Sequence, residues 1–253
     1  MSVEAVKELK VANNSIWENV KTIGIALLIA LVIRAFLFQP FNIPSGSMKS
    51  TLLEGDYLFV SKFAYGYSRH SLPFSPPVFD GRVLAGTPER GDVVVFKLPR
   101  DGKTDYIKRV IGLPGDKIQL RSGVTYINGV PVERERVEDF IEQDAYGNLA
   151  RVPRYRETLA NGVSYDTLDR YANGDYDNTQ VYVVPEGHYF MMGDNRDQSA
   201  DSREAHAVSY VPAENLVGRA EVLFFSTDGS AAFWEVWNWP GSIRWDRLFQ
   251  SVQ

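Results

Sequence analysis

Two short segments of the sequence contain residues that could together hydrolyse a bond. Ser47 lies in Pro44-Ser-Gly-Ser-Met48, and Lys108 lies in Asp105-Tyr-Ile-Lys-Arg109. A free serine hydroxyl is a poor nucleophile and needs an adjacent base. A lysine can be that base when burial lowers its pKa from its usual value of about 10.4. Ser-Gly-Ser is also a common turn, and Lys108 could be an ordinary surface lysine.

The position of Ser47 favours the chemical interpretation. It follows within ten residues of an apolar run, Thr22 to Phe38, and Gly46 beside it permits close backbone approach. A hydroxyl nucleophile just outside a membrane anchor, with a lysine available as its base, indicates a protease that works at a membrane surface.

The alternation of side chains along a strand does not say which basic residue is buried. Lys108 and Arg109 must face opposite sides of their strand. Each side carries one cation and two apolar residues, so both possibilities stay open at this point.

The apolar run that precedes Ser47 has the length of a short membrane span. Its 17 residues, Thr22 to Phe38, compare with the roughly 17–25 that a bilayer needs. Arg34 lies near one end, where its guanidinium can reach the headgroups. A buried core helix would show more polar breaks, a cleaved leader would end in small residues, and an interfacial helix would have a polar face. We therefore expect a polar tail over 1–21 and one uncleaved span over 22–39.

The composition excludes several classes of function. The chain has no Cys, so a thiolate nucleophile and a Cys-based zinc site are impossible. Its three histidines lie far apart without metal-ligand spacing, and we expect neither a metal nor a cofactor. The net charge of −5 argues against nucleic-acid binding, which usually needs a basic surface.

The rest of the chain, 40–253, predicts a mainly β domain. Short runs rich in Val, Ile and Tyr alternate with Gly and Pro turns. Asn128-Gly129 predicts a hairpin with a type I′ turn between Val124–Ile127 and Val130–Val132. The other expected strands are Tyr57–Val60, Asp92–Lys97, Tyr106–Ile111, Lys117–Leu120, Val181–Val184, Tyr189–Met192 and Ala220–Phe225.

Two segments of this domain stand out by composition. Residues 134–178 are rich in turns and acidic, which predicts a solvated polar insertion, and we expect a short helix at Phe140–Gln143. The tail from Phe233 to Phe249 carries four tryptophans. These tryptophans fit either ordinary core packing or a surface that dips into lipid headgroups, and the sequence does not separate the two.

A third polar segment, Gly193 to Arg203, has several interpretations. It lacks the glycine and terminal glutamate spacing of an EF-hand calcium loop. It could also be a simple polar turn. A third interpretation comes from the resemblance described next.

Taken together, these motifs resemble bacterial type I signal peptidase, a family of membrane-bound serine proteases. The resemblance covers most of the chain outside 134–178. It rests on the apolar run, Ser-Gly-Ser-Met48, Thr51-Leu-Leu-Glu-Gly-Asp56, Lys62-Phe-Ala-Tyr-Gly66, Arg90-Gly-Asp-Val93, Tyr106-Ile-Lys-Arg109 and Gly193-Asp-Asn-Arg-Asp197. One departure is Ser50, where many members have proline.

The resemblance implies a role for each polar residue of the site. Ser47 would be the nucleophile and Lys108 its general base. Ser45 and the backbone N–H of Ser47 would form the oxyanion hole, which needs donors fixed where negative charge develops. Ser199 would hydrogen-bond the lysine amine. The remaining polar residues would support the site, with Arg203 paired to a carboxylate; they are Asp194, Asp201 and Arg203.

The resemblance also implies a substrate, a fold and a location. Substrates would be the signal peptides of exported preproteins, docked as an added strand. Shallow pockets for small side chains would be lined by Phe41, Ile43, Met48, Leu52, Leu58, Tyr106 and Ile107. The fold would be the mainly β Ser-Lys peptidase fold. The span would lie in the bacterial inner membrane, with residues 1–21 in the cytoplasm and the catalytic domain 40–253 outside.

Two other functions remain to be compared with this one. Self-cleaving repressors share the Ser-Lys fold, but they would carry a DNA-binding helix-turn-helix where this chain has an apolar run. A membrane-anchored β module that binds peptides without cutting them would have no need of Ser47 or Lys108.

Overall fold

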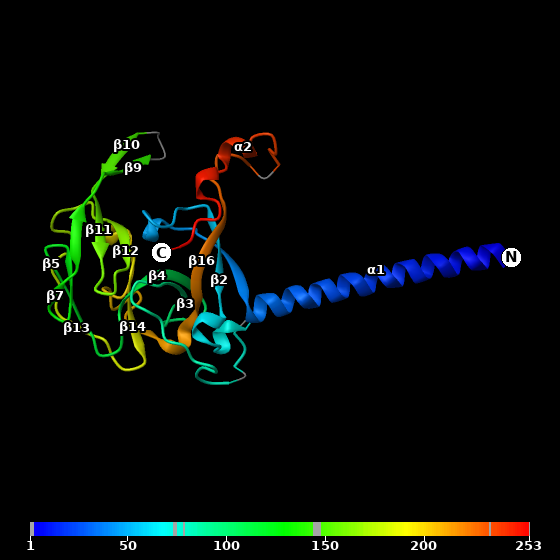
Figure 1. Ribbon diagram of the computed structural model, residues 1–253, viewed down its shortest axis with the longest axis horizontal. Helices are drawn as coiled ribbons and strands as arrows, with labels where there is room; N and C mark the ends of the chain where they lie inside the picture. Colours follow the sequence, from blue (N-terminus) through cyan, green and yellow to red (C-terminus); the bar gives the residue numbers. More distant parts are fainter. Residues whose placement is uncertain (1–2, 73–74, 78, 144–147, 233, 253) are drawn as a thin grey trace.

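The computed structural model describes residues 3–72, 75–77, 79–143, 148–232 and 234–252, and it describes side chains from Trp17 onward. A long N-terminal helix projects from a β-rich domain (Figure 1). The helices are α1 (Val3–Phe36), α2 (Trp239–Ser242) and the 3-10 turns η1 (Gly46–Met48), η2 (Phe63–Tyr65), η3 (Arg69–Ser71), η4 (Arg196–Gln198), η5 (Ala213–Asn215) and η6 (Trp245–Arg247). The strands are β1 (Phe38–Asn42), β2 (Asp56–Ser61), β3 (Val93–Lys97), β4 (Asp105–Gly112), β5 (Lys117–Arg121), β6 (Val124–Ile127), β7 (Val130–Pro131), β8 (Glu133–Arg136), β9 (Phe140–Gln143), β10 (Leu149–Val152), β11 (Arg154–Thr158), β12 (Ser164–Leu168), β13 (Tyr182–Val183), β14 (His188–Met192), β15 (Val211–Pro212) and β16 (Leu216–Ser226). The expected mainly β fold with an N-terminal apolar helix is confirmed.

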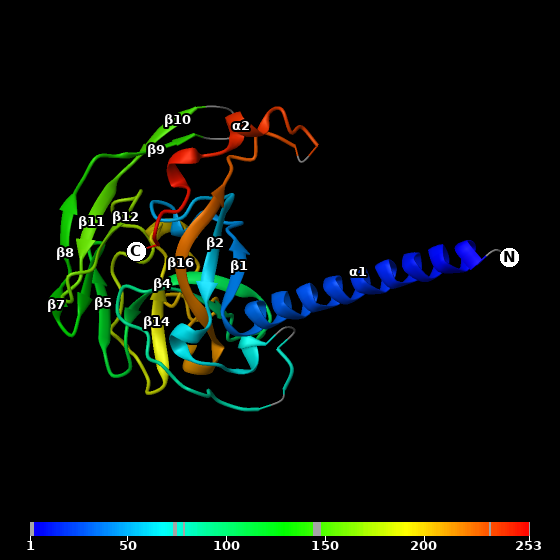
Figure 2. The same cartoon turned by 45° about the vertical axis from the view of Figure 1, so that its right-hand side comes forward.

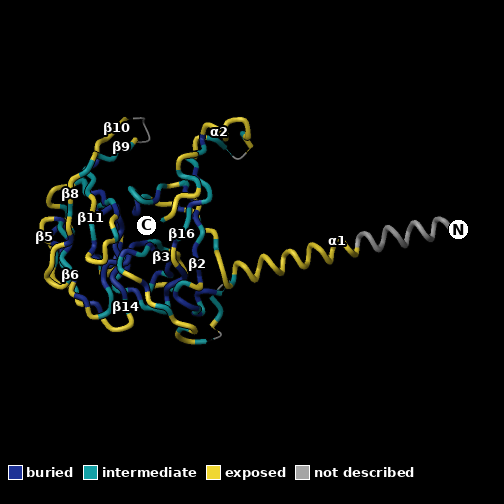
Figure 3. Tube along the Cα trace, viewed as in Figure 1, coloured by how far each residue is buried: buried dark blue, intermediate teal, exposed yellow. Residues whose placement is uncertain are grey.

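Helix α1 exposes its apolar residues instead of packing them. The segment Trp17–Phe36 has a mean hydropathy of 1.8 and is long enough to cross a membrane. Leu27 and Leu28 are each 61% exposed, and the described part of the helix is exposed along nearly its whole length (Figure 3). A core helix would bury one face, so this segment is not a core helix of the domain.

One seven-stranded antiparallel sheet forms the centre of the domain, in the order β1-β2-β16-β3-β4-β14-β15. Alternating residues of β3 show how it is packed. Val93 and Val95 belong to one buried cluster, and Val94 and Phe96 belong to another on the opposite face. Because both faces are covered, four consecutive residues of β3, Val93 to Phe96, are all buried.

Three smaller sheets lie beside the main one, in the orders β13-β5-β6-β7, β12-β11-β8 and β10-β9. The predicted hairpin is confirmed, since Ile127 pairs with Val130 across the turn. Asn128 and Gly129 have φ values of 54° and 83°, as a type I′ turn requires. A third buried cluster, which includes Ile118, Leu120 and Phe190, joins these sheets to β14.

The structure corrects the interpretation of residues 134–178 in two respects. Phe140–Gln143 is strand β9, paired with β10, and is not helical. The described part of the segment also forms β8, β11 and β12, and it contributes to the core, since Tyr165 and Leu168 are buried. Its charges are tolerated there because they are paired: the fully buried Glu157 binds the Arg196 guanidinium at 2.6 Å.

The tryptophan-rich tail lies on the surface. Trp234, Trp237 and Trp245 are 75%, 72% and 60% exposed, which excludes core packing for these three rings. Figures 1 and 2 show the α2 segment projecting from the domain on the side from which α1 leaves. Core packing is thus wrong for these rings, and contact with lipid headgroups stays a prediction.

Candidate active site

Ser47 and Lys108, which are 61 residues apart in the sequence, meet in the folded domain. Ser47 lies in the 3-10 turn η1 that follows β1, and Lys108 lies on the central strand β4. Lys108 Nζ donates a hydrogen bond of 2.5 Å to Ser47 Oγ. Both residues are buried, with exposed fractions of 9% and 3%. The arrangement brings an amine into direct contact with a hydroxyl in a site with little access to water.

The pKa of Lys108 is lowered to about 8, chiefly because burial disfavours the charged ammonium. The carboxylates of Asp201 and Asp194 oppose this shift, and the Arg203 guanidinium adds to it. A lysine with this pKa is substantially neutral in mildly alkaline solution, so it can accept a proton.

Arg109, the neighbour of Lys108, is also buried, but on the opposite face of β4. Its guanidinium donates to both carboxylate oxygens of Asp194, at 2.9 and 2.7 Å. It also donates to Gly91 O at 2.7 Å and lies 4.1 Å from the centre of the Tyr165 ring. A buried arginine needs these partners because an unpaired charge in the core is costly. Both cations of the motif are therefore internal.

The segment from Gly193 to Arg203 packs against the turn that carries Ser47. The backbone N–H of Asn195 donates to Ser47 O at 3.1 Å, and its side-chain amide donates to Gly46 O at 2.9 Å. A Cβ added to Gly193 would lie 2.1 Å from Ser199 Oγ and 2.5 Å from Ser47 O. Only glycine fits between these two serines, because no side chain can be closer than van der Waals contact.

Two buried ion pairs, Arg203–Asp201 and Arg109–Asp194, hold the same segment in place. Arg203 pairs with the Asp201 carboxylate through two hydrogen bonds of 2.8 Å, so the expected carboxylate partner of Arg203 is confirmed. Asp201 also accepts the N–H of Gly193 at 3.0 Å. Burial alone would raise the pKa of Asp201, but the charge and hydrogen bonds of Arg203 hold it below its usual value. Thr51 Oγ1 donates to Asp194 at 2.5 Å, which ties the Ser47 side of the site to the Arg109 pair.

The two other serines of the expected site lie near Ser47. Ser45 is exposed, and its Oγ is 3.5 Å from Ser47 Oγ. Ser199 Oγ is buried and does not bond Lys108 in this state. Its hydroxyl lies on the side of Asp201 and contributes to the lowered pKa of that carboxylate.

An open cavity of about 530 Å³ adjoins Ser47 and Lys108. Four of the expected pocket residues line it, namely Phe41, Ile43, Tyr106 and Ile107. The other three do not line it; Met48, Leu52 and Leu58 are fully buried in the core cluster beneath the site. Sequence proximity to Ser47 could not distinguish these two groups.

One edge of β4 beside the cavity is free. Asp105–Arg109 pairs with β3 on one side, whereas β14 pairs with β4 only from Arg109 to Gly112. In the described chain, no strand pairs with Asp105–Lys108 on the β14 side. The cavity therefore presents unpaired main-chain groups next to the hydroxyl of Ser47.

Ser50, where many members of the resembling family have proline, adopts a φ of 89°. Proline fixes φ near −65°, so it cannot adopt this conformation. The Ser50 hydroxyl instead donates to Asp166 O at 2.5 Å, which anchors the turn after Ser47 to β12.

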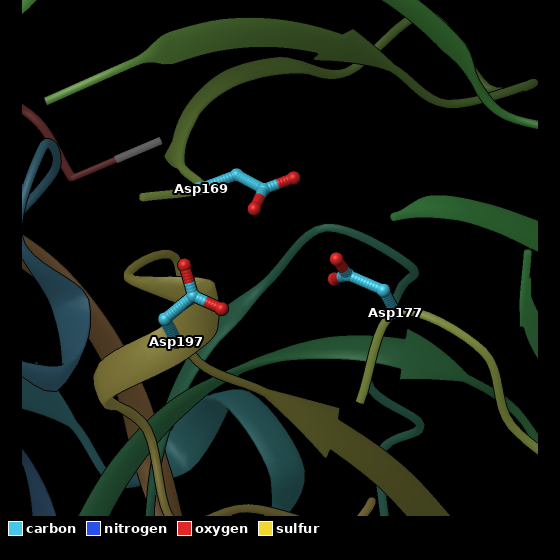
Figure 4. Close-up of side chains that lie close together, drawn as sticks. All are labelled: Asp169, Asp177 and Asp197. Atoms are coloured by element: carbon cyan, nitrogen blue, oxygen red, sulfur yellow. The ribbon is translucent and has the colours of Figure 1, made fainter. Parts of the chain in front are cut away.

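Three carboxylates outside this site lie close together: those of Asp169, Asp177 and Asp197 (Figure 4). Their nearest oxygens are within 4.8 Å of one another, close enough among the described residues to share a cation. Each already makes local bonds: Asp197 accepts two backbone N–H groups, Asp177 accepts one, and Asp169 pairs with Arg134. Burial, and then the neighbouring carboxylates, raise the pKa of Asp177. These bonds account for the positions of all three residues.

Several residues of the site were not assigned a role from the sequence. Gly193 and Asn195 belong to the motif Gly193-Asp-Asn-Arg-Asp197, and the motif itself was the signal that could have identified them. Thr51 and Arg196 likewise lie in motifs of the resemblance, Thr51-Leu-Leu-Glu-Gly-Asp56 and Gly193-Asp-Asn-Arg-Asp197. Glu157 gave no such signal, and its role is evident only from its distant partner Arg196.

Comparison with known proteins shows the family of the chain. A family model described as "Signal peptidase, peptidase S26" matches residues 16–225. The chain is 42% identical to a signal peptidase I of Rickettsia typhi over 259 residues, 95% of each protein, and 44% identical to one of Rickettsia conorii over 245 residues, 89% of each. A solved signal peptidase I from Enterococcus faecalis is 29% identical, with a TM-score of 0.33, and the alignment covers 53% of this chain and 97% of that one. The chain therefore belongs to the signal peptidase family, peptidase S26, a family of serine hydrolases.

Proposed function

We propose that the protein is a membrane-anchored endopeptidase that removes N-terminal signal peptides from exported preproteins by acyl-enzyme chemistry, with Ser47 as nucleophile and Lys108 as base. One observation carries the assignment of the two residues: a buried amine with a lowered pKa lies 2.5 Å from a buried serine hydroxyl. The membership of the signal peptidase family supports the substrate class.

In the first half-reaction, the neutral amine of Lys108 accepts the hydroxyl proton of Ser47. Before this transfer the hydrogen bond runs from Ser47 Oγ–H to the lone pair of Lys108 Nζ, and as the proton moves to Nζ, Oγ attacks the scissile carbonyl carbon. The carbonyl electron pair moves onto its oxygen. The C–N bond then breaks as the Lys108 ammonium returns the proton to the leaving amine. This step releases the mature protein and leaves the signal peptide as an ester on Ser47.

In the second half-reaction, water takes the place of the leaving amine. Neutral Lys108 accepts a proton from the water, and the hydroxide attacks the ester carbonyl. Collapse of the intermediate breaks the C–Oγ bond, and the lysine proton returns to Ser47 Oγ. The signal peptide leaves with a new carboxylate.

Negative charge on the carbonyl oxygen needs fixed donors in both half-reactions. We assign this role to the backbone N–H of Ser47 and to the hydroxyl of Ser45, which lies 3.5 Å from Ser47 Oγ and faces the cavity. The contacts of Asn195 with the carbonyls of Ser47 and Gly46 hold this turn in place.

Ser199 is assigned to orient the amine of Lys108. Its buried hydroxyl lies between the Asp201 carboxylate and Gly193, beside Ser47, and is not bonded to Lys108 in this state. Once the Lys108 lone pair points at Ser47, one amine N–H needs another acceptor, and Ser199 Oγ can supply it. The Asp201–Arg203 and Asp194–Arg109 pairs hold the strands around this contact without touching the substrate.

The substrate is assigned to the free edge of β4. An extended peptide would pair with Asp105–Lys108 and place its side chains in the cavity of about 530 Å³. Phe41, Ile43 and Ile107 line this cavity with apolar bulk, which favours small side chains one and three residues before the cut.

The exposed apolar helix supports anchoring in a membrane. We propose that Trp17–Phe36 spans the bacterial inner membrane, with its N-terminus in the cytoplasm and the β domain outside. Exported preproteins emerge on that face, so their cleavage sites would reach the cavity beside Ser47. The exposed tryptophans near α2 would make a second contact with the headgroup layer.

The test is a preprotein cleavage assay on the full chain in detergent. Wild-type protein should cut at the signal-peptide junction, and a folded Ser47→Ala variant should bind the preprotein without cutting it. If the wild type also bound without cutting, the chain would be a peptide-binding module and the proposal would be wrong.

A further inference from the structure

A second cavity, of about 580 Å³, lies where α1 meets the β domain. Leu31 and Arg34 of α1 form one wall, and Lys97 at the end of β3 and Lys103 of the β3–β4 connection form another. Leu72 and Val217 add apolar surface. This cavity is separate from the one at Ser47, with which it shares only Asp105. The reaction proposed above does not use it.

The charges around this cavity are not balanced. Three cations line it, Arg34, Lys97 and Lys103, against the single carboxylate of Asp105. Lys97 uses that carboxylate at 2.8 Å. The side chains of Arg34 and Lys103 have no ion pair or hydrogen bond within the described part of the chain. Two exposed cations without partners among the described residues therefore line one open cavity, where their combined charge would attract an anion.

Two buried bases, Lys62 and His70, lie near these cations. The pKa of Lys62 is lowered to about 8, first by burial and then by the charge of Arg34, with Lys97 contributing in the same direction and Asp105 opposing it. The pKa of His70 is also lowered, by burial and then by Arg69 and other cations that include Lys97. In both residues burial is the larger cause, and the neighbouring cations lower the pKa further.

His70 contributes a further polar group to the cavity wall. Its Nε2 accepts a hydrogen bond of 3.3 Å from Arg69 Nε, so a neutral ring carries its proton on Nδ1. His70 is 5% exposed, and its Nδ1 is buried without a partner among the described residues. A buried donor without an acceptor is costly. An oxygen-rich ligand in the cavity would provide an acceptor on this side.

We propose that this cavity binds the phosphate of an anionic phospholipid, through Arg34 and Lys103, with Lys97 and His70 beside them. The inference rests on the membrane placement proposed above, which sets the end of α1 at the headgroup layer. Leu31 is 55% exposed on the same helix, so the acyl chains of a lipid could continue along it from the cavity. A lipid with a net negative charge fits best, because two cations there lack partners.

The test measures lipid binding directly, and so does not depend on cleavage. Full-length protein in a nonionic detergent is titrated with phosphatidylglycerol or phosphatidylcholine, and bound lipid is counted by native mass spectrometry. We expect phosphatidylglycerol to bind preferentially. An Arg34→Gln/Lys103→Gln variant should bind it about 30-fold more weakly, the effect expected for the loss of two basic contacts with an anionic lipid.

The matched control is Lys117→Gln/Arg151→Gln, which makes the same change of charge at two exposed residues of β5 and β10. It should bind phosphatidylglycerol like the wild type. Equal binding by the Arg34/Lys103 variant and the wild type, or equal binding of the two lipids by the wild type, would overturn the proposal. Thermal unfolding of all three proteins verifies that they are folded.

Two further arms separate the possible outcomes. Inorganic phosphate at millimolar concentration should not displace phosphatidylglycerol; displacement would mean that the cavity is a free-phosphate site and would overturn the lipid assignment. Preprotein cleavage is measured in parallel in the nonionic detergent. Loss of cleavage by the wild type would contradict the proposed function, whereas loss of lipid selectivity alone would contradict only this inference.

Discussion

Lys108 and Arg109 are consecutive residues of β4, and both of their charged groups are buried, on opposite faces of the strand. Lys108 meets the hydroxyl of Ser47, and Arg109 meets the carboxylate of Asp194. The two partners have different consequences. Asp194 keeps Arg109 charged, whereas Ser47 offers Lys108 no compensating charge, so burial lowers the pKa of Lys108 to about 8. One strand thus holds a structural cation next to a potential base.

The first prediction concerns the pH dependence of cleavage. If neutral Lys108 is the base, kcat/KM should rise with pH through about 8, because the folded protein loses the Lys108 proton there. Lys108→Met and Lys108→Arg should both be folded and nearly inactive, since methionine has no base and guanidinium does not deprotonate. Preprotein cleavage from pH 6 to 10 measures the profile.

The control for this profile is Lys62, whose pKa is also lowered to about 8. Lys62→Met should leave the rise of kcat/KM through about pH 8 unchanged, and so should paired replacement of His188 and His206. The assignment of Lys108 would be contradicted if Lys62→Met abolished this rise of kcat/KM with pH, or if folded Lys108→Met had near-normal turnover.

The second prediction concerns stability. The folded pKa of Lys108 is about 8 and its unfolded value is 10.5, so between these pH values the unfolded chain holds a proton that the folded chain has lost. Wild-type stability therefore rises with pH across this window. Lys108→Met should be more stable than wild type at pH 7, and the difference should shrink by up to roughly 3 kcal/mol by pH 10.5. Denaturant unfolding at several pH values tests this, and a variant no more stable than wild type at pH 7 would contradict it.

The third prediction uses the close packing at Gly193. A Cβ there would lie 2.1 Å from Ser199 Oγ and 2.5 Å from the backbone carbonyl of Ser47. Gly193→Ala should therefore displace the Ser47 turn and lower kcat by at least about 100-fold, because catalytic groups tolerate little misplacement. Gly241→Ala, where no atom lies within 4 Å of the added carbon, is the control and should retain activity. Equal activity of the two variants would exclude this packing.

The fourth prediction concerns the cleavage site. The cavity beside Ser47 is lined by bulky residues such as Phe41, Ile43 and Ile107. Sequencing of the cut products should show Ala or another small residue one and three positions before the scissile bond. A preference for large or charged residues at these two positions would rule out this cavity as the specificity pocket.

The fifth prediction concerns the tryptophans near α2. The protein is reconstituted into vesicles that contain brominated lipid, which quenches tryptophan fluorescence only on contact. If the α2 segment lies in the headgroup layer, Trp234→Phe/Trp237→Phe should lower the quenched fraction, because two lipid-contacting rings are lost. If the segment lies in water, the same variant should raise the quenched fraction, which would exclude the second membrane contact.

Local patterns in the sequence were sufficient for the parts of the molecule that depend on near neighbours. The apolar run, the hairpin at Asn128-Gly129 and most strands depend on hydrophobicity, backbone freedom and alternation over a few residues. The motif around Ser47 and the one around Lys108 identified the chemistry, with the help of a family resemblance. The helix expected at Phe140–Gln143 was wrong because pairing with β10 decides that segment, and its partner follows later in the chain.

The tertiary structure alone decided which side chains are internal. Alternation left Lys108 and Arg109 equivalent, and both became buried because β3 and β14 flank their strand while Ser47 and Asp194 reach it from opposite faces. Met48 and Leu52 were likewise placed by the tertiary structure: they lie close to Ser47 in the sequence, but they are packed in the core and do not line the cavity. Burial depends on contacts between segments far apart in the chain, such as the 61 residues from Ser47 to Lys108. A sequence pattern records the chemistry of each segment, but only the packed fold determines how much water each group keeps, and hence its pKa.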